Sequence, residues 1–329
     1  MTLRPARLEP QFVPRIWGAR NLAPLFPEKK SLREPVGEVW LTGNECRFAD
    51  GPFAGEKLGD AWPRMEDEWA GKNAWRDRPF PFLVKFLFPE DKLSVQVHPD
   101  DEYAAKNEAA AGGVGKTEMW YVISARPGAE VRVGLKHDVT REQFRRAIAD
   151  GTAEDCVEKV QVQAGDAVFV PAGTVHTIGP GMVLCEIQEN SDITYRVFDY
   201  NRRTAEGKPR ELHVEKAFDV IRFGKQQGGK VALGQRKDGD DGISVLVDCP
   251  HFSVVKLAFA GPQRAAKPEG RMELVVVLEG RGTLRAERGD ASVEYAPAQA
   301  WLVPGASQDC YFEPEEPTTL LRVSAPGKS

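Results

Sequence analysis

The sequence lacks cysteine pairs and long apolar segments, and each of these absences excludes a class of protein. Its five cysteines are scattered over positions 46, 156, 185, 249 and 310, with no CxxC pair. An odd number of separate thiols argues against a disulfide framework and fits a reducing compartment. No apolar run approaches the roughly 20 residues needed to cross a bilayer, and the start, MTLRPARLEPQF, lacks the apolar stretch of a secretion signal. We therefore expect a soluble, cytoplasmic protein with no membrane partner.

An excess of positive charge is missing as well. The chain carries 44 Lys and Arg against 49 Asp and Glu, which gives a net charge of -5 at pH 7. That sign is wrong for a general nucleic-acid binder, so we expect no nucleic-acid partner. The 329 residues exceed one typical domain, and hydrophobic residues at 41% suffice for a folded core. We expect two compact units, in which any anionic ligand is bound by a local cluster of cations.

Short runs of β-branched and aromatic residues dominate the chain, separated by Gly, Pro, Asp and Asn. They lie at 81–88, 93–98, 119–123, 167–170 and 183–188, and later at 252–259, 273–278 and 320–323. This pattern is typical of an all-β sandwich or jelly roll, so it predicts a mainly β fold.

Two segments have the periodicity of helices. Thr140 and Gln143 form a capping box, and Gly151 can end the helix that follows. In residues 212–222 the apolar side chains recur at helical spacing. Both patterns predict helices that cover the core of the first unit.

Residues 223–230, FGKQQGGK, are rich in Gly and Gln and have little to bury. We read them as a linker and place the domain boundary there. Residues 1–230 then form the first domain, with the helical segments, and residues 231–329 form a second jelly-roll domain.

The two predicted domains share a weak internal repeat. Residues 165–176, GDAVFVPAGTVH, resemble residues 298–308, AQAWLVPGASQ, around a common Val-Pro core. In the second copy Gln308 or Asp309 stands where the first copy has a histidine. We therefore expect the second domain to be metal-free and structural.

Three polar residues interrupt the apolar strands in a pattern that suits a metal. Gln96 and His98 lie two residues apart in one strand-like run, so their side chains point to the same face. Glu118 shares a face of a second strand with Trp120 and Val122, where a carboxylate is costly unless it is paired or binds a cation. A single histidine in such a place is more often a satisfied core residue, so the case depends on a third ligand.

The third stretch, residues 165–176, supplies that ligand. Turns at each end of a short strand bring His176 next to the earlier strands of a rolled sheet. The imidazoles of His98 and His176, the Glu118 carboxylate and the Gln96 amide oxygen then make a mixed nitrogen and oxygen set. Such a set suits one divalent metal ion, with zinc fitting best, and leaves room for water or substrate.

Several motifs together resemble the type I mannose-6-phosphate isomerases in their short bacterial form. They are 38–43 (EVWLTG), 94–104 (SVQVHPDDEYA), 115–121 (GKTEMWY), 165–178 (GDAVFVPAGTVHTI) and 194–200 (TYRVFDY). The resemblance implies a double cupin fold with one zinc ion, bound by Gln96, His98, Glu118 and His176. It also implies the interconversion of mannose 6-phosphate and fructose 6-phosphate.

The resemblance runs from about Trp17 to Arg202 and has two departures. Cupins tend to have Asn four residues after the last histidine ligand, where this chain has Pro180. Longer members of the family have a His-Lys pair before the ligand Glu, where this chain has Gly115 and Lys116. A ring-opening role of that histidine therefore has no obvious holder here.

Three cations complete the predicted site. Lys85 is the single charged residue of an apolar strand. Burial and a nearby dication would favour its neutral form, which can act as a base. Alternatively, its side chain could reach water at the end of the strand. Lys116 lies two residues before Glu118 and can reach a metal-bound sugar. Arg196 matches the arginine treated as catalytic in the family and could bind a phosphate or an enediolate, the alternative being a surface ion pair with Asp199.

The predicted reaction moves a proton between neighbouring carbons through an enediolate, whose negative charge the metal stabilises. Two other functions stay open, a cupin-type non-haem iron oxygenase and a non-catalytic sugar-binding cupin. The amide ligand and the three cations favour an anionic sugar phosphate as the small-molecule partner. His137, His213 and His251 fall in no such pattern, and we expect them to be structural or exposed.

Overall fold

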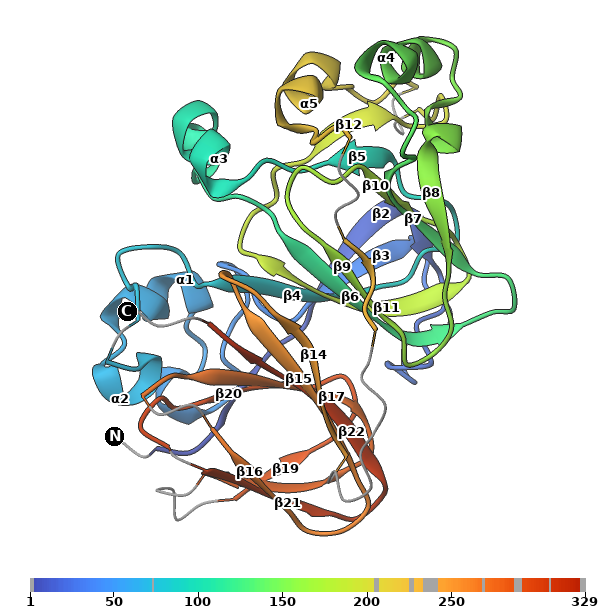
Figure 1. The fold of residues 1–329 in the computed structure, drawn as a ribbon. Helices are drawn as coiled ribbons and strands as arrows, with labels where there is room; N and C mark the ends of the chain where they lie inside the picture. The colour runs from blue at the N-terminus through green and yellow to red at the C-terminus, as the bar shows by residue number, and fades with distance from the viewer. Residues whose placement is uncertain are drawn as a thin grey trace.

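The described residues fold as four antiparallel β-sheets that form two stacked units (Figure 1). The computed structural model describes residues 3–72, 74–203, 207–224, 228–232, 242–267, 270–286, 292–307 and 309–325. This mainly β architecture of two jelly-roll units, with helices on the first, confirms the fold class predicted from the sequence.

The first unit contains a seven-stranded and a five-stranded sheet. The seven strands lie in the order β13 (Gly229–Lys230), β9 (Ala167–Val170), β6 (Glu118–Ala125), β11 (Met182–Glu189), β4 (Phe82–Leu87), β3 (Val36–Trp40) and β2 (Gln11–Ala19). The five strands lie in the order β12 (Tyr195–Phe198), β5 (Val95–Val97), β10 (His176–Ile178), β7 (Glu130–Leu135) and β8 (Val157–Gln161).

The second unit contains a six-stranded and a four-stranded sheet. The six strands lie in the order β1 (Ala6–Leu8), β20 (Ala300–Val303), β17 (Glu273–Glu279), β22 (Thr318–Ser324), β15 (Ser253–Phe259) and β14 (Ile243–Asp248). The four strands lie in the order β16 (Gln263–Ala266), β21 (Asp309–Pro314), β18 (Gly282–Ala286) and β19 (Val293–Tyr295).

Short helices fill the connections of the first unit. The α-helices are α1 (Leu58–Ala61), α2 (Asp67–Ala70), α3 (Asp101–Asn107), α4 (Arg141–Ala149) and α5 (Val214–Val220). Single 3₁₀ turns lie at Gly51–Phe53, Trp62–Arg64, Ala109–Ala111 and Ala153–Cys156. Figure 1 shows α3, α4 and α5 on the side of the first unit that faces away from the second. Within the described ranges, no helix combines the length and apolarity needed to span a membrane.

The two sheets of the first unit enclose a core because side chains alternate along each strand. On β6, Trp120 and Val122 belong to this core, whereas Met119 and Tyr121 pack in a different cluster on the opposite face. The shared face predicted for Glu118, Trp120 and Val122 is thereby confirmed.

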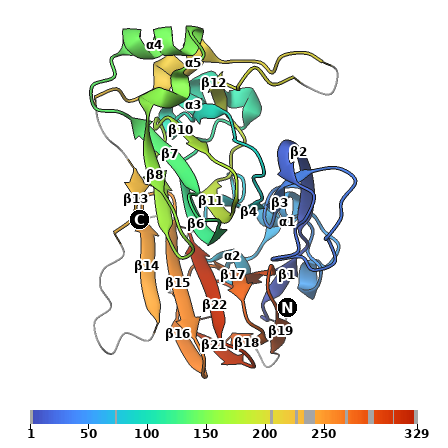
Figure 2. The same ribbon diagram turned by 90° about the vertical axis from the view of Figure 1, so that its right-hand side faces the viewer.

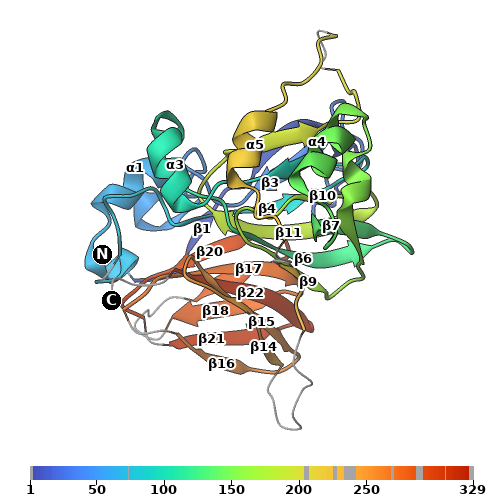
Figure 3. The same ribbon diagram turned by 45° about the horizontal axis from the view of Figure 1, so that its top comes forward.

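The opposite face of the seven-stranded sheet packs against the second unit. Phe86, Tyr121 and Ile187 share one buried cluster with Val276 and Leu321 of the six-stranded sheet. Figure 3 shows β11 and β6 lying over β17 and β22. Each fully buried side chain of this kind contributes about 1.5–3 kcal/mol, so the contact between the units is a hydrophobic core in its own right.

The helix predicted after Thr140 is confirmed, including its capping box. The Thr140 hydroxyl accepts from the Gln143 backbone N–H at 3.2 Å, and the Gln143 side chain accepts from the Thr140 N–H at 2.7 Å. The second predicted helix, 212–222, is shorter in the structure, where α5 begins after His213 and ends before Ile221. His213 makes no side-chain cap, and the extended backbone of Ile221 stops the helical hydrogen bonding.

The two units repeat one strand order. The order β9, β6, β11, β4 of the first unit corresponds to β20, β17, β22, β15 of the second. The strands within the weak sequence repeat, β9 and β20, therefore hold equivalent places. Gln308 lies outside the described residues, and Asp309 accepts from Arg264 Nε at 2.6 Å.

The start of the chain contributes to the second unit. Strand β1 pairs with β20, with Ala6 opposite Leu302, and Figure 2 shows β1 beside the strands of that unit. In the predicted linker 223–230, residues 225–227 lie outside the described residues, while Gly229 and Lys230 pair with β9. The division of the chain at residue 230 stays a prediction.

Candidate functional site

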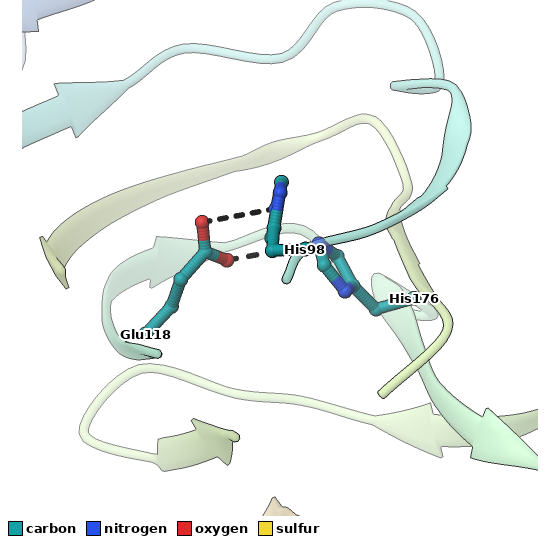
Figure 4. A group of neighbouring side chains, drawn as sticks. All are labelled: His98, Glu118 and His176. Carbon is teal, nitrogen blue, oxygen red and sulfur yellow. Dashed lines mark ion pairs between the residues drawn. The ribbon is translucent and has the colours of Figure 1, made fainter. Parts of the chain in front are cut away.

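Three strands of the first unit bring two imidazoles and a carboxylate together (Figure 4). His98 follows β5, Glu118 opens β6 and His176 opens β10. His98 Nε2 lies 3.3 Å from Glu118 Oε1, and His176 Nε2 lies 3.6 Å from Glu118 Oε2. One potential ligand atom from each residue lies within 4.8 Å of the others, and all three residues are buried.

The backbone around His176 explains this convergence. His176 pairs directly with Gln96 of β5, and the Gly173 N–H donates to the His98 carbonyl at 2.8 Å. Gly173 has a φ of +83°, and a Cβ there would lie 2.9 Å from the Val220 carbonyl oxygen. Only glycine fits this turn without strain, so the Pro-Ala-Gly turn sets the path of the chain toward His176.

Hydrogen bonds at Nδ1 fix both histidines so that their Nε2 atoms face Glu118. His98 Nδ1 lies 2.8 Å from the Ile193 carbonyl oxygen, and His176 Nδ1 lies 2.9 Å from the Thr174 carbonyl oxygen. A carbonyl can only accept, so each Nδ1 carries the proton. Burial, with Lys116 nearby, lowers the pKa of His98 to about 3, and burial lowers the pKa of His176 as well. Both rings are therefore neutral and aim a lone pair at Glu118.

The atoms that face one another at this site fit a divalent cation. His98 Nε2 and both carboxylate oxygens of Glu118 are buried without a hydrogen-bond partner among the described residues. Burial alone would raise the pKa of Glu118, but the Lys116 ammonium beside the carboxylate outweighs burial and keeps this pKa well below its usual value. Lys116 Nζ lies 3.3 Å from Glu118 Oε1 and offsets charge at that oxygen. The His98 lone pair and Glu118 Oε2 still lack a partner, and they repel one another unless a cation lies between them. Two imidazoles and one carboxylate are a usual set for zinc.

Gln96 lies at the edge of this cluster. Its Nε2 is 3.3 Å from His176 Nε2, and its Oε1 accepts from the Ser94 hydroxyl at 3.0 Å. The amide nitrogen therefore faces the cluster, whereas a metal ligand requires the oxygen. The two ends of an amide have nearly the same shape, and Nε2 can donate to the Ser94 hydroxyl after a half turn. The prediction that Gln96 is a fourth ligand requires that turned orientation.

Lys85 is buried and paired, which neither expectation for it foresaw. Its Nζ lies 2.9 Å from Glu186 Oε2 and 3.9 Å from Glu38 Oε2. Burial alone would lower the pKa of Lys85, but the two carboxylates outweigh burial and raise the pKa above its usual value. The side chain does not reach water, and the raised pKa favours the cationic amine over the neutral base, which was the other alternative for it. A catalytic role of Lys85 itself stays a prediction.

Sequence reasoning missed the two glutamates that pair with Lys85. Glu186 lies on β11, directly opposite Lys85 of β4 on one side and Trp120 of β6 on the other. The indole N–H of Trp120 donates to Glu186 Oε1 at 2.9 Å. Glu38 is held by Arg15 through bonds of 2.9 and 3.0 Å. Each glutamate is a single charge inside an apolar run, the same signal that singled out Lys85.

Lys116 lies at the metal cluster, as its position two residues before Glu118 predicts. Its side chain is only 4% exposed, and its Nζ lies 3.3 Å from Glu118 Oε1. Its backbone N–H donates to the Pro99 carbonyl at 3.0 Å, which ties this segment to the end of β5. Lys116 is therefore the cation closest to the three candidate ligands among the residues predicted for the site.

Arg196 belongs to the same row of side chains as two predicted ligands. It lies opposite Gln96 on β5, and Gln96 lies opposite His176 on β10. Residues directly opposite one another in a sheet point to the same face, and neighbouring strands are about 4.8 Å apart. Arg196 is therefore placed two strands from His176, on the face that carries the cluster.

The hydrogen bonds of Arg196 leave part of its guanidinium available. Its Nη1 donates to the Glu211 carbonyl at 3.1 Å, and its buried Nε has no hydrogen-bond partner in the described part of the chain. Asp199, the alternative ion-pair partner, is engaged by Arg202 and by Arg210, whose Nη1 lies 3.2 Å away.

Comparisons with known proteins identify the family of the chain. A sequence model described as phosphomannose isomerase type I, catalytic domain, matches residues 6–119. The probable mannose-6-phosphate isomerase GmuF of Bacillus subtilis (strain 168) is 37% identical over 290 residues, which are 85% of this chain and 87% of that protein. The crystal structure of mannose 6-phosphate isomerase from Bacillus subtilis has a TM-score of 0.84 and 29% identity, covering 97% of this chain and 99% of that one.

A zinc-bound mannose 6-phosphate isomerase shares the fold, with a TM-score of 0.71 and 16% identity over 98% of this chain and 99% of that one. The relative that is 37% identical covers most of both chains, and the family model matches the segment that leads to Glu118. The chain therefore belongs to the type I phosphomannose isomerase family.

Proposed function

We propose that this chain interconverts mannose 6-phosphate and fructose 6-phosphate with the help of one divalent metal ion, with zinc fitting best. The observation that carries the proposal is the set of buried, unpartnered atoms on His98 and Glu118, with His176 Nε2 beside them. Relatives named for this reaction match most of the chain, and one structure with the same fold contains zinc.

The residues proposed to hold the ion are His98, Glu118 and His176, with the Gln96 amide oxygen as a fourth ligand. When bound, a divalent ion polarises the oxygens of the sugar and stabilises negative charge that develops on them. This ligand set carries one formal negative charge, from Glu118, so the loaded site stays positive. A positive site favours an anionic sugar phosphate.

Lys116 and Arg196 are proposed to bind and orient the substrate. Lys116 is buried beside Glu118, where its three N–H donors can reach an oxygen of a sugar at the cluster. The guanidinium of Arg196 is planar and always charged, and it suits a phosphate or an enediolate oxygen. Its unpartnered Nε supports this role. The two cations together keep the reacting carbons in one orientation.

The reaction requires a base that moves a proton between C1 and C2. Lys85 is protonated beside Glu186, so it can accept a proton only after it has given one away. Glu186, 2.9 Å from the amine, is the acceptor at hand. We propose that Lys85 acts as the base through this pair, and C2 proton exchange in a Lys85→Met variant tests the proposal.

A cupin-type oxygenase and a sugar-binding module are the alternatives. Two histidines and a carboxylate also suit non-haem iron. Lys116 and Arg196 beside the cluster favour an anionic sugar over dioxygen. The buried Lys85–Glu186 pair can transfer a proton, which an isomerase requires and a sugar-binding module does not.

The second unit is proposed to be a metal-free structural domain. In the common strand order, Glu273 opens β17 as Glu118 opens β6. Glu273 accepts two hydrogen bonds from the Arg322 guanidinium, at 3.0 and 2.6 Å. A built-in cation thus stands beside this carboxylate, so it needs no metal ion. All five cysteines are free, which supports a reducing, cytoplasmic location.

A coupled assay of mannose 6-phosphate conversion tests the proposed function. We expect activity to be lost after chelation and to return when Zn²⁺, Mn²⁺ or Co²⁺ is added. Isotope exchange at C2 separates an isomerase from a binding module, which gives none. Oxygen consumption coupled to turnover would rule out the isomerase, and metal analysis should find one ion per chain.

A further inference from the structure

A second cluster of titratable residues lies where the two units meet. His251, in the turn between β14 and β15, reaches from the second unit to two carboxylates of the first. Its Nδ1 lies 2.9 Å from Glu189 Oε2 and 3.8 Å from Asp101 Oδ2. The three residues line a cavity of about 590 Å³, and they were not among the residues that the sequence assigned to the site.

This second cluster differs from the metal cluster in its hydrogen bonds. Glu189 Oε1 accepts from the Thr117 backbone N–H at 2.7 Å, and Asp101 Oδ1 accepts from the Gly115 N–H at 2.8 Å. The remaining oxygens face His251. Each carboxylate therefore has a partner on both sides, and the imidazolium supplies the positive charge. The cluster is complete without a metal ion.

The segment that these carboxylates hold is the one that leads to the metal cluster. Between Gly115 and Thr117 lies Lys116, and Glu118 follows at once. The segment packs closely on the start of α3, because a Cβ at Gly115 would lie 2.6 Å from the Asp101 backbone nitrogen. Two of its amides depend on side-chain carboxylates rather than on a strand neighbour, so its position depends on those carboxylates.

We propose that His251 is a positioning residue that, through Glu189 and Asp101, holds the segment carrying Lys116 and Glu118 at the metal cluster. The catalytic part of this proposal rests on the proposed function. Without His251 the two carboxylates face each other with no cation between them, and Glu189 is only 4% exposed. Repulsion and burial then drive them apart or protonate one of them, and either change weakens the hold on the segment.

Among the described residues, Glu189 and Asp101 are the charged groups within ion-pair distance of His251, and Asp77, Arg78 and Arg271 also line the cavity. Glu189 and Asp101 are the groups that raise its pKa, and burial opposes them. The Cys249 thiol, two residues earlier in the same turn, donates to the Phe252 carbonyl at 3.2 Å. The second unit thereby contributes one side chain, His251, that helps to position the metal cluster, although none of the predicted ligands lies on its strands.

Hydrogen exchange and metal affinity of a His251→Ala variant test the proposal. We expect the peptide that covers residues 113–119 to exchange about tenfold faster than in the wild type, because the Gly115 and Thr117 amides lose their fixed acceptors. We expect zinc affinity, measured by chelator competition, to fall by about 10- to 100-fold, as for other residues that orient metal ligands. A His251→Lys variant keeps a cation in a cavity with room for it and should recover part of both effects.

Arg281→Ala is the matched control, because Arg281 forms an exposed ion pair with Glu316 in the second unit, 3.4 Å long. It should leave exchange of the 113–119 peptide and zinc affinity unchanged. Exchange and affinity within twofold of the wild type in His251→Ala would overturn the proposal, even if its melting temperature falls. If His251→Ala does not fold, Glu189→Gln carries the same test. A wild type without isomerase activity would refute the proposed function and leave the exchange result valid.

Discussion

Removal of the metal should destabilise this protein by an amount that can be worked out from three atoms. His98 Nε2 and both oxygens of Glu118 are buried and lack hydrogen-bond partners among the described residues. Each unpaired buried polar atom costs about 1–3 kcal/mol, and Lys116 Nζ, 3.3 Å from Glu118 Oε1, offsets the cost at that oxygen. The metal-free protein therefore bears roughly 2–6 kcal/mol. A bound ion removes this cost. The lower bound corresponds to a rise in melting temperature of about 3 °C on binding, at about 1.4 °C per kcal/mol for a chain of this length.

Glu118→Gln should abolish most of this metal-dependent shift. The substitution keeps the shape of the side chain but removes the single formal negative charge of the ligand set. Binding stabilises by about 2.7 kcal/mol when the free metal is at 100 times its dissociation constant. If the constant rises about 100-fold, the same metal concentration gives only about 0.4 kcal/mol, and the shift falls to about 0.6 °C.

The assay is thermal unfolding of the wild type and of Glu118→Gln, each after chelation and after addition of zinc. Glu294→Gln is the control, because Glu294 is an exposed glutamate on β19 of the second unit. We expect it to keep the full shift. The reasoning is refuted if chelation moves the wild-type melting temperature by less than about 1 °C, or if Glu118→Gln keeps the wild-type shift.

Three further outcomes follow from the charges around the site. Lys85→Met leaves the buried Glu186 without its cation and should lower the free energy of unfolding in urea by about 3–5 kcal/mol, and the double variant with Glu186→Gln should recover part of this loss. Near-normal C2 proton exchange in the single variant would show that Lys85 is not the base. Arg196→Ala should lower kcat/KM for mannose 6-phosphate about 10- to 150-fold, which corresponds to the loss of one charge-assisted hydrogen bond. The control Arg203→Ala should keep kcat/KM within about threefold of the wild type. An unchanged kcat/KM in Arg196→Ala would show that Arg196 does not belong to the site. Glu189 raises the pKa of His251, so the ion pair between them stabilises the fold fully below the unfolded pKa of about 6.5, and this stabilisation is lost as pH rises through the folded pKa. The difference in melting temperature between wild type and His251→Ala should therefore be largest near about pH 6 and smaller at higher pH. A difference that does not change with pH would contradict this.

Local patterns in the sequence were enough to predict the strands and the three residues that meet at the candidate site, His98, Glu118 and His176. The alternation along 118–122 placed Glu118 and Trp120 on one face, because successive side chains of a strand point to opposite sides. The spacing from Gly165 to His176 predicted turns on either side of a short strand, and both glycines of those turns, Gly165 and Gly173, have positive φ angles. These features depend on a few neighbouring residues, so the sequence carries them.

Tertiary structure decided the charge states and the partners. Lys85 looks like a lone amine in its own strand, and only the neighbouring strands reveal that Glu186 and Glu38 make it a cation. His251 follows β14 in the second unit, yet it meets Glu189 and Asp101 of the first across the contact between the units. A pKa depends on charges within a few ångströms in space, and those charges come from distant parts of the chain. The sequence by itself could therefore single out the polar residues that gather at the candidate site. Their protonation and their partners were decided by the packing of one strand, and one unit, against another.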